Sequence, residues 1–396
     1  MSDPNAVEAK AVLQGDGTAH VTIDGLTETV SGIDETEAKR AAIGVVVNRA
    51  RETGSEFVVD VADPDGHGTL RVTPEGSVTS ETADAEPATR RELRTARDFA
   101  GTKKAAPTGP AEMGWRGAAN RVGFKLAPGS VEMTRRGWRA AIQRGLLGHK
   151  TVAFVNLKGG STKTTCTYLI GATLGRVRGG NILAWDNNEN KGTLADRAIR
   201  ANHDHTAIDL LDHIEDFQTP ENAPHLVNYV RPQGESKFSV LASQDQGSTR
   251  PVIDGAAFSR LHKALRQFYH LILVDTGNAS NASTWQAAAS EADEIVVVAM
   301  NKEDSAKTAA STIDDLVAQG HADKLKRGIA IVTQPREEDA ERLARMVDHL
   351  SGYVREVVVV PFDRALDDGD DIVYERLSKR TKEAFTKAAA AIVAGL

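Results

Sequence analysis

The sequence predicts an α/β protein: a doubly wound, mostly parallel sheet forms the main domain, and a small α+β domain precedes it. Three observations support this fold class. From residue 150 onward, short runs rich in Val and Ile alternate with longer helical patterns, the order expected when strands and helices alternate. These runs lack polar alternation, as expected for strands covered on both faces. Before residue 79, apolar and polar residues instead alternate, as in half-buried strands.

The composition sets the first limits. With 396 residues, 40% hydrophobic and 26% charged, the chain is long enough for two or three globular domains. No apolar run approaches the length of a membrane span, and the N-terminal residues lack a secretory pattern, so we expect a cytoplasmic protein without a transmembrane segment. The single cysteine, Cys166, excludes an internal disulfide framework and a multi-cysteine metal site.

Residues 1–78 are expected to form the small α+β module. Alternating strands are predicted at Lys10–Gln14 and Thr18–Asp24, followed by a helix that a capping-box pattern at Asp34 opens. Two further strands, Phe57–Ala62 and Thr69–Thr73, complete a ββαββ unit. The module shows no catalytic constellation, and a docking module for a partner is its functional alternative.

Residues 79–149 are predicted to be a linker, with a short helix over 88–99, that leads into a basic, tryptophan-bearing segment. From Arg90 to Lys150 there are fourteen basic residues against four acidic ones, although the whole chain carries −7. Two interpretations remain open. The basic region 90–150 could bind non-specific DNA or an acidic membrane surface, or its tryptophans could pack on the following domain while the arginines stay solvated.

Residues 150–396 are expected to form one domain. Its predicted strands, after the one near residue 152, are Ile182–Trp185, Phe238–Ala242, His270–Asp275, Glu294–Ala299, Gly328–Thr333 and Glu356–Pro361. Helices are predicted from Lys163 to about Val177 and over residues 254–268, 283–290, 304–319, 336–350 and 372–394.

The stretch from Thr151 to Thr165, TVAFVNLKGGSTKTT, reads as a buried strand that runs into a glycine-containing loop and a helix. The loop comprises Lys158, Gly159, Gly160, Ser161 and Thr162, and Lys163, Thr164 and Thr165 open the helix. Loop N–H groups, the helix N-terminus and a lysine together make a cradle for an anion such as a nucleotide phosphate. Thr162 stands where a P-loop usually has glycine, so a positive φ there would be costly.

The two-lysine pattern Lys-Gly-Gly-x-x-Lys-Thr-Thr resembles the deviant Walker A motif of the ParA/MinD family of P-loop ATPases. The resemblance implies that the domain binds ATP and Mg²⁺, with Lys163 bridging the β- and γ-phosphates. In that family the first lysine, here Lys158, reaches the nucleotide of a facing subunit, which implies a homodimer formed on ATP binding. The segment before the loop is also similar to actinobacterial ParA/MinD-like proteins, some associated with type VII secretion loci and others with plasmids.

Polar residues at strand ends complete the predicted site, because ligands of open parallel sheets lie beyond these ends. Asp275 ends an apolar strand in a Walker B arrangement, where it and Thr164 would hold Mg²⁺. Asp186 ends the second strand and is either a catalytic residue or a turn cap. The family commonly has a second aspartate two positions later. Here that position is Asn188, which can orient water but cannot accept its proton.

Further strand ends are expected around the nucleotide. The loop Thr276–Ser280 lies where the family has its second switch, unless it is an ordinary strand–helix connection. Thr333, Pro361 and Asp363 are expected to frame the base, and the resemblance places the strand end at Pro361 and Asp363 where the family contacts adenine. For the turn that begins at Pro361, a simple proline-bounded turn is an equal alternative.

We therefore expect an ATPase that hydrolyses ATP slowly, is stimulated by a protein partner, and acts as a dimerisation switch in plasmid or chromosome partitioning or in intracellular positioning. The alternatives are a MinD-like regulator of a secretion or cell-pole apparatus, or a catalytically weak nucleotide-binding scaffold, which Thr162 and Asn188 favour. A metabolic P-loop enzyme is less consistent, since no substrate-binding constellation is evident.

Overall fold

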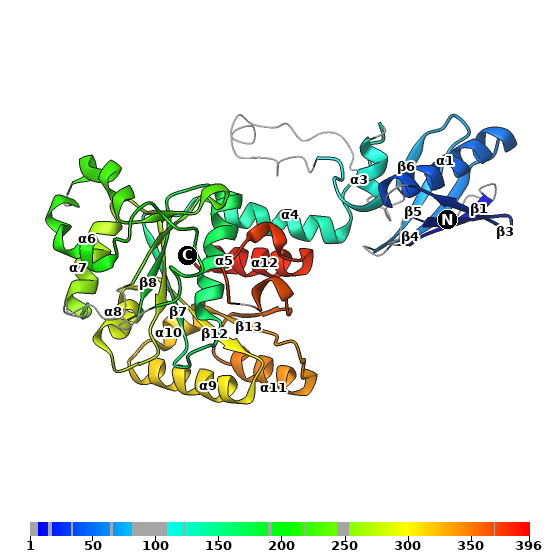
Figure 1. Ribbon diagram of the computed structural model, residues 1–396. Coiled ribbons are helices and arrows are strands. Elements are labelled where there is room, and N and C mark those ends of the chain that lie inside the picture. Colours follow the sequence, from blue (N-terminus) through cyan, green and yellow to red (C-terminus); the bar gives the residue numbers. More distant parts are fainter. Residues whose placement is uncertain are drawn as a thin grey trace, which may run out of the picture. The chain divides into compact units, whose positions relative to one another are not determined.

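The structure, a computed structural model, divides into two compact units, Met1–Arg136 and Gly137–Leu396 (Figure 1). It describes residues 7–14, 18–32, 35–63, 66–80, 109–121, 123–188, 192–217, 219–243, 253–367 and 369–396. The predicted helix over 88–99 falls outside these residues, as does Asp34 of the predicted capping box.

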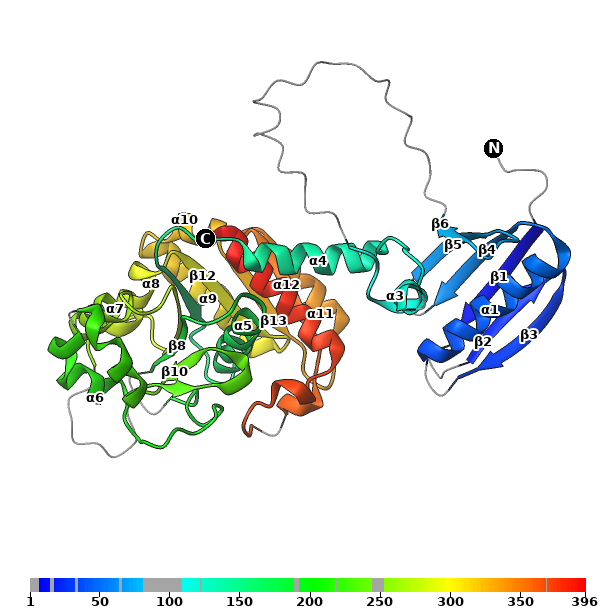
Figure 2. The ribbon, with the colours of Figure 1, turned by 90° about the horizontal axis from the view of Figure 1, so that it is seen from above.

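The first unit is built on a six-stranded sheet (Figure 2). The strands are β1 (Val7–Leu13), β2 (Thr18–Ile23), β3 (Leu26–Ser31), β4 (Phe57–Asp63), β5 (Gly66–Val72) and β6 (Val78–Ser80), in the spatial order β3-β2-β1-β4-β5-β6. The pairing of β1 with β4 is parallel, and the others are antiparallel. Helix α1 (Glu35–Thr53) connects β3 to β4. The unit is therefore βββαβββ rather than the expected ββαββ.

Residue alternation explains which strands were predicted. In β1 and β2, every second residue is buried, and these small and branched side chains form a core with α1. Strand β3 (LTETVS) is exposed along nearly its whole length because it lies at the sheet edge. It therefore has no apolar alternation from which it could have been recognised.

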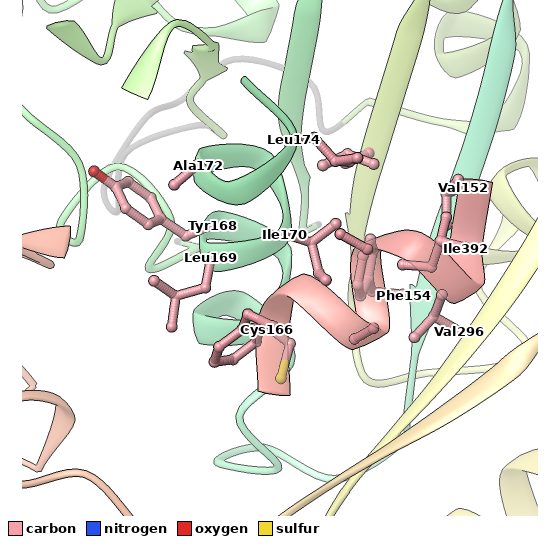
Figure 3. Packing of buried hydrophobic residues seen from close by; sticks show 14 of the residues in the cluster. Val152, Phe154, Cys166, Tyr168, Leu169, Ile170, Ala172, Leu174, Val296 and Ile392 are labelled. Atoms are coloured by element: carbon pink, nitrogen blue, oxygen red, sulfur yellow. The ribbon is translucent and has the colours of Figure 1, made fainter. Parts of the chain in front are cut away.

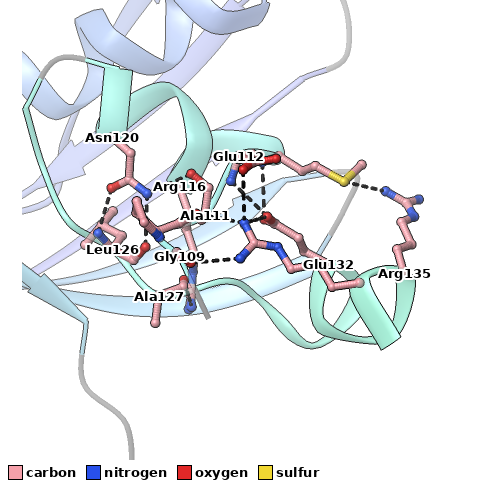
Figure 4. Close-up of polar contacts among 12 residues, drawn as sticks. Gly109, Ala111, Glu112, Arg116, Asn120, Leu126, Ala127, Glu132 and Arg135 are labelled. Carbon is pink, nitrogen blue, oxygen red and sulfur yellow. Dashed lines mark hydrogen bonds and ion pairs between the residues drawn. The ribbon is translucent and has the colours of Figure 1, made fainter. Parts of the chain in front are cut away.

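Residues 109–136 belong to the first unit. Helix α3 (Gly114–Arg121) places Trp115 in the core with α1 and the sheet. Glu132, at the start of α4 (Ser130–Gln143), is buried and accepts hydrogen bonds from the backbone N–H groups of Glu112, at 2.9 Å, and Met113, at 3.2 Å (Figure 4). Arg136 pairs with this carboxylate at 2.7 Å.

The boundary between the units thus lies at 136/137 rather than at the expected 149/150. The expected packing of the tryptophans on the following domain holds for only one of the two. Trp115 instead packs in the first unit, whereas Trp138 packs against the core of the second unit.

The second unit contains an eight-stranded sheet in the order β14-β13-β12-β7-β11-β8-β10-β9. Its strands are β7 (Lys150–Val155), β8 (Ile182–Asn187), β9 (Arg231–Pro232), β10 (Ser239–Leu241), β11 (Leu271–Thr276), β12 (Glu294–Met300), β13 (Ile329–Thr333) and β14 (Glu356–Val360). All neighbours are parallel except β9 and β10, so the mostly parallel sheet that we expected is confirmed.

Helices cover both faces of this sheet. One face packs against α5 (Lys163–Arg178), α12 (Lys379–Gly395) and Ile142 of α4, around residues such as Val152, Phe154 and Val296 (Figure 3). The other face packs against α6 (Ala207–Asp212), α7 (Gly255–Leu265), α8 (Ser283–Glu291), α9 (Glu303–Ala318), α10 (Ala322–Arg327) and α11 (Ala340–Ser351). Coverage on both sides explains the continuous apolar runs of the central strands.

The last helix begins later than its apolar pattern suggested. Ser378 caps α12, accepting a hydrogen bond from the Thr381 N–H, so the helix starts at Lys379 rather than near residue 372. The residues before it form the 3₁₀ turns η4 (Arg364–Leu366) and η5 (Tyr374–Arg376). Within the described residues, the helices are too short or too polar to cross a lipid bilayer.

Candidate functional site

The predicted phosphate loop joins β7 to α5 at the carboxyl end of the sheet. Asn156, the residue that follows β7, is fully buried and anchors the loop to the neighbouring strand. The Asn156 side chain donates to the Val298 carbonyl at 2.7 Å and accepts from the Lys158 N–H at 2.8 Å. Because the loop is fixed at its base, the backbone of Gly159 and Gly160 lines a cavity of about 720 Å³.

Lys163 lies inside this loop and is 6% exposed. Its Nζ donates to the carbonyl oxygens of Asn156, at 2.8 Å, and Lys158, at 3.3 Å, and to Oδ1 of Asn278 at 2.5 Å. Burial lowers the pKa of Lys163, and the charge of Asp275 opposes that shift. The lysine is thus held at the loop by three oxygens, with its positive charge on the floor of the cavity.

Thr162 has the unfavourable conformation that its position in the motif suggested. Its φ of 68° and ψ of 16° are left-handed, which costs a residue with a Cβ about 1–2 kcal/mol. Its hydroxyl lies 2.9 Å from the Thr333 hydroxyl at the end of β13 and donates to the Ser161 carbonyl at 2.5 Å. The β-branched residue is therefore tied to the end of β13.

Thr164 and Asp275 meet at the other side of the loop. The Thr164 hydroxyl donates to Oδ2 of Asp275 at 2.6 Å. Asp275 is 3% exposed, and no described group donates a hydrogen bond of normal geometry to its buried Oδ1. Burial raises the pKa of Asp275 to about 6, against the opposing effects of Lys163 and Thr164.

Asp186 is the strand neighbour of Asp275, since the two residues are paired in the register of β8 and β11. It is 2% exposed, and its Oδ2 accepts the Leu194 N–H at 3.1 Å. Burial, followed by the charge of Asp275, raises the pKa of Asp186 to about 8. The carboxyl therefore holds the loop after β8, whereas Asn188 lines the cavity itself.

Lys158 points to a different partner from Lys163. Its Nζ forms an ion pair with Asp304 of α9 at 2.9 Å, and its side chain is 34% exposed. Both lysines of the motif leave the same loop, but only Lys163 lines the cavity described here.

Thr333, Pro361 and Asp363 also line the cavity. The Asp363 carboxylate accepts the backbone N–H of Ala365 at 3.0 Å and that of Ser378 at 2.8 Å. These bonds give Asp363 an anchoring role at the start of η4 and before α12.

The structure brings most predicted site residues together in one cavity, and it adds several that were not singled out. The predicted residues in the lining are Gly159, Gly160, Ser161, Thr162, Lys163, Thr164, Thr165, Asn188, Asp275, Thr333, Pro361 and Asp363. The additional polar residues include Thr193, Arg197, Lys302 and Arg336. Lys302 and Arg336 follow strand ends by a few positions, which was the available sequence signal. Thr193 and Arg197 follow β8 at a distance that no motif marks.

The candidate ligands for a metal ion at this site are few. Within the described parts of the chain, no group of three or more His, Cys, Asp or Glu side chains could hold a metal ion. The oxygens of Thr164 and Asp275 could supply two ligands of a Mg²⁺ ion, and phosphate and water would have to supply the others. Mg²⁺ is commonly bound in this way. The buried Oδ1 of Asp275 without a donor fits that role.

No protein-family model matches the sequence. The sequence is 29% identical over 292 residues to the ESX-1 secretion-associated protein EspI of Mycobacterium tuberculosis, a match that covers 71% of this chain. It covers 42% of that protein, so the chain spans less than half the length of this curated relative.

Among solved structures, a ParA family ATPase from Chlorobium tepidum matches with a TM-score of 0.50 and 15% identity, over 61% of this chain and 98% of that chain. The cell-division ATPase MinD of Pyrococcus furiosus matches with a TM-score of 0.46 and 22% identity, over 61% of this chain and 98% of that chain. The sheet order, the phosphate loop and the similarity to the Chlorobium structure lead to one conclusion: the second unit has the fold of the ParA/MinD-family P-loop ATPases.

Proposed function

We propose that the chain binds ATP with Mg²⁺ in the cavity of the second unit and hydrolyses it slowly. One observation carries the proposal. In a single cavity, a glycine-containing loop with a buried lysine adjoins a threonine–aspartate pair that has one buried carboxylate oxygen without a donor. Loop amides and Lys163 are suited to phosphate oxygens, and Thr164 with Asp275 is suited to a hard cation.

In this proposal the loop amides of Gly159 and Gly160 wrap the phosphate chain, and Lys163 stabilises its terminal negative charge. Mg²⁺, when bound, would neutralise charge on the phosphates. Thr333 and Pro361 would border the base. Asp363 would act there by holding its turn in place, since both of its oxygens already accept backbone N–H groups.

Slow turnover is supported by the residue at the end of β8 that faces the cavity. Asn188 can orient a water molecule but cannot take its proton. Asp186, two positions earlier in the chain, is buried outside the cavity lining and accepts the Leu194 N–H. We therefore propose weak basal activity that a protein partner stimulates.

A nucleotide-dependent homodimer is the second part of the proposal. Lys158 leaves the same loop as Lys163 yet pairs with the exposed Asp304, an ion pair that solvent screens. Such a pair opens at little cost. Lys158 would then be available to the nucleotide of a second copy, as the resemblance to the deviant Walker A motif implies.

Nucleotide binding tests the first part. The full chain is titrated with a fluorescent ATP analogue and Mg²⁺, and [γ-³²P]ATP hydrolysis is followed in parallel. Lys163→Met should reduce affinity by at least about tenfold, because a charge-assisted contact is worth about 1.5–3 kcal/mol. Lys326→Met, at an exposed lysine of α10, is the matched control and should bind as the wild type does. Absence of ATP binding by the wild-type chain would refute the proposal.

Light scattering coupled to gel filtration tests the dimer. With a non-hydrolysable ATP analogue and Mg²⁺, the wild type should double in mass, and Lys158→Ala should bind the analogue but remain a monomer. Asp304→Asn is the matched control, because it breaks the same ion pair but leaves Lys158 in place and should still dimerise. A Lys158→Ala chain that dimerises normally would contradict the proposed role.

The biological setting is a separate proposal with two candidates. The similarity to a secretion-associated protein favours a regulatory role at a secretion apparatus. Partitioning of DNA is the other candidate, with the basic region 90–150 as a DNA contact. In the described part of that region, Arg136 bonds to the Gly109 and Pro110 carbonyls, and Arg144 bonds to the Val393 carbonyl. These arginines are already engaged within the chain.

DNA binding by the full chain, measured at two salt concentrations with ATP, with ADP and without nucleotide, separates the candidates. A steep salt dependence in the ATP state would favour partitioning. No binding in any nucleotide state would favour the secretion role.

A further inference from the structure

The loop after β8 is fastened to the sheet at the point where it passes the phosphate loop. The Gly192 N–H donates to the Ser243 hydroxyl at 2.8 Å, and the Leu194 N–H donates to Asp186 at 3.1 Å. The Thr193 carbonyl accepts the Arg197 N–H at 3.2 Å. Thr193 is therefore held by its own carbonyl and by both of its neighbours in the chain.

Glycine is required at position 192 for this arrangement. A Cβ there would lie 2.0 Å from Oδ2 and 2.1 Å from Oδ1 of Asp186, closer than non-bonded atoms approach. The buried carboxyl group thus packs directly on the Gly192 backbone, which brings the next residue, Thr193, to the edge of the cavity.

The Thr193 side chain reaches the residues that we assigned to the cation. Its hydroxyl donates to the Thr164 hydroxyl at 3.3 Å, and the Thr164 hydroxyl in turn donates to Asp275 at 2.6 Å. The bond from Thr193 is long and exposed, so it can be exchanged for a better partner at small cost. Consecutive hydrogen bonds therefore link three side-chain oxygens that come from three separate segments of the chain.

We propose that Thr193 supplies a third protein oxygen at the cation side of the nucleotide site, as a ligand of Mg²⁺ or of a water molecule bound to it. This inference rests on the proposed ATP–Mg²⁺ function. Through the Thr193 hydroxyl, the loop after β8 would contact the cation or its water. Asn188, in the same loop, has an amide and not a carboxylate for such a contact. Hydroxyl oxygens are suitable ligands for this hard cation, as the threonine of a P-loop shows.

The link extends beyond the cavity. Arg197, in the turn that Thr193 opens, donates from Nη1 to the Asp370 carbonyl at 3.1 Å, and its own carbonyl accepts the Ile372 N–H at 3.0 Å. If the Thr193 hydroxyl exchanges Thr164 for the cation, these two bonds would carry the movement to residues 370–372, which precede η5. Switch segments that order on contacts with phosphate-bound Mg²⁺ behave in this way.

The test compares Thr193→Val, which keeps the shape but loses the hydroxyl, with Thr193→Ser, which keeps the hydroxyl. Affinity for a fluorescent ATP analogue is measured on the full chain with Mg²⁺ and with EDTA. Hydrogen exchange of residues 192–198 is measured with the analogue and Mg²⁺. Thr386→Val removes a threonine hydroxyl that bonds within α12 and serves as the matched control. Thermal unfolding in EDTA verifies that each variant is folded.

Mg²⁺ should increase the affinity for the analogue about tenfold less in Thr193→Val than in the wild type. This is the lower end of the effects seen when groups that support a metal site are removed. Its affinity in EDTA should not change, and exchange of residues 192–198 should no longer slow on addition of Mg²⁺. Thr193→Ser and Thr386→Val should behave as the wild type.

Two outcomes overturn the inference while leaving the proposed function intact. In one, Thr193→Val keeps the wild-type Mg²⁺ dependence. In the other, the valine and serine variants lose it equally, which would show that the hydroxyl is not the responsible group. If the wild-type chain binds no ATP in either condition, the proposed function itself fails, and the inference fails with it.

Discussion

Replacement of Gly192 by alanine tests the packing that positions the loop after β8. The new Cβ would lie 2.0–2.2 Å from three atoms of the Asp186 carboxyl group, and both residues are buried. The carboxyl group cannot move aside freely, because its Oδ2 accepts the Leu194 N–H. Either the loop or the carboxyl group must therefore shift.

The expected cost has two parts. Overpacking a close-packed site costs about 1–3 kcal/mol. The pKa of Asp186 is raised to about 8, so its carboxyl group is mostly neutral at pH 7, and loss of a hydrogen bond to it costs about 0.5–1.5 kcal/mol. Together the two parts predict that Gly192→Ala lowers the free energy of unfolding by about 1.5–4.5 kcal/mol. Asp186→Ala removes the atoms that clash, so the two substitutions should not be additive, with a coupling energy above about 1 kcal/mol.

The assay is urea denaturation of the full chain and the three variants, followed by tryptophan fluorescence and by nucleotide binding. Gly180→Ala is the matched control. At Gly180 the nearest atom to a new Cβ is the Lys237 carbonyl oxygen at 3.8 Å, so its stability should stay within about 0.5 kcal/mol of the wild type. A Gly192→Ala chain as stable as this control, or additive effects in the double variant, would refute the packing argument.

Three further predictions concern stability. Burial raises the pKa of Glu294 to about 8 despite its ion pair with Arg355, so the native state binds this proton more tightly than the unfolded state does. Wild-type stability relative to Glu294→Gln should therefore be greatest below about pH 4.5 and should fall by roughly 3–4 kcal/mol as the pH rises to about 8; parallel denaturation profiles at pH 5, 6.5 and 8 would contradict this. Trp115→Ala should destabilise the first unit by about 3–5 kcal/mol, so hydrogen exchange should accelerate in residues 7–80 but not in the second unit, and uniform acceleration would argue against two separate cores. Asn156→Ala should leave the Val298 carbonyl and the Lys158 N–H without their partner, lowering stability by about 1–3 kcal/mol and weakening ATP binding; unchanged binding would show that the loop keeps its shape without this anchor.

Much of the second unit could be predicted from local pattern. Buried parallel strands need apolar residues on both faces, so β7, β11, β12 and β13 appear in the sequence as short Val- and Ile-rich runs. The phosphate loop was evident because a strand, a glycine-containing loop and a helix are contiguous in the chain. The motif also predicts a positive φ at Thr162, with an energetic cost for a β-branched residue, because the motif fixes the backbone at that position.

Local pattern was insufficient where an element or a side chain depends on distant partners. Strand β3 has no apolar alternation because it is a sheet edge, and α12 starts at its cap rather than at the start of its apolar pattern. Asp186 illustrates the same limit for the site, because the sequence could place it at a strand end but could not show that Leu194 occupies its carboxyl group.

The sequence by itself determined that this protein contains a parallel sheet with a phosphate loop, because the continuous apolar runs of the strands and the loop motif are encoded by neighbouring residues. Only the tertiary structure decided that Lys158 pairs with Asp304 and that Thr193 stands beside Thr164. These contacts join residues that are far apart in the chain. Their geometry arises from the packing of strands and helices against one another, which no local pattern specifies.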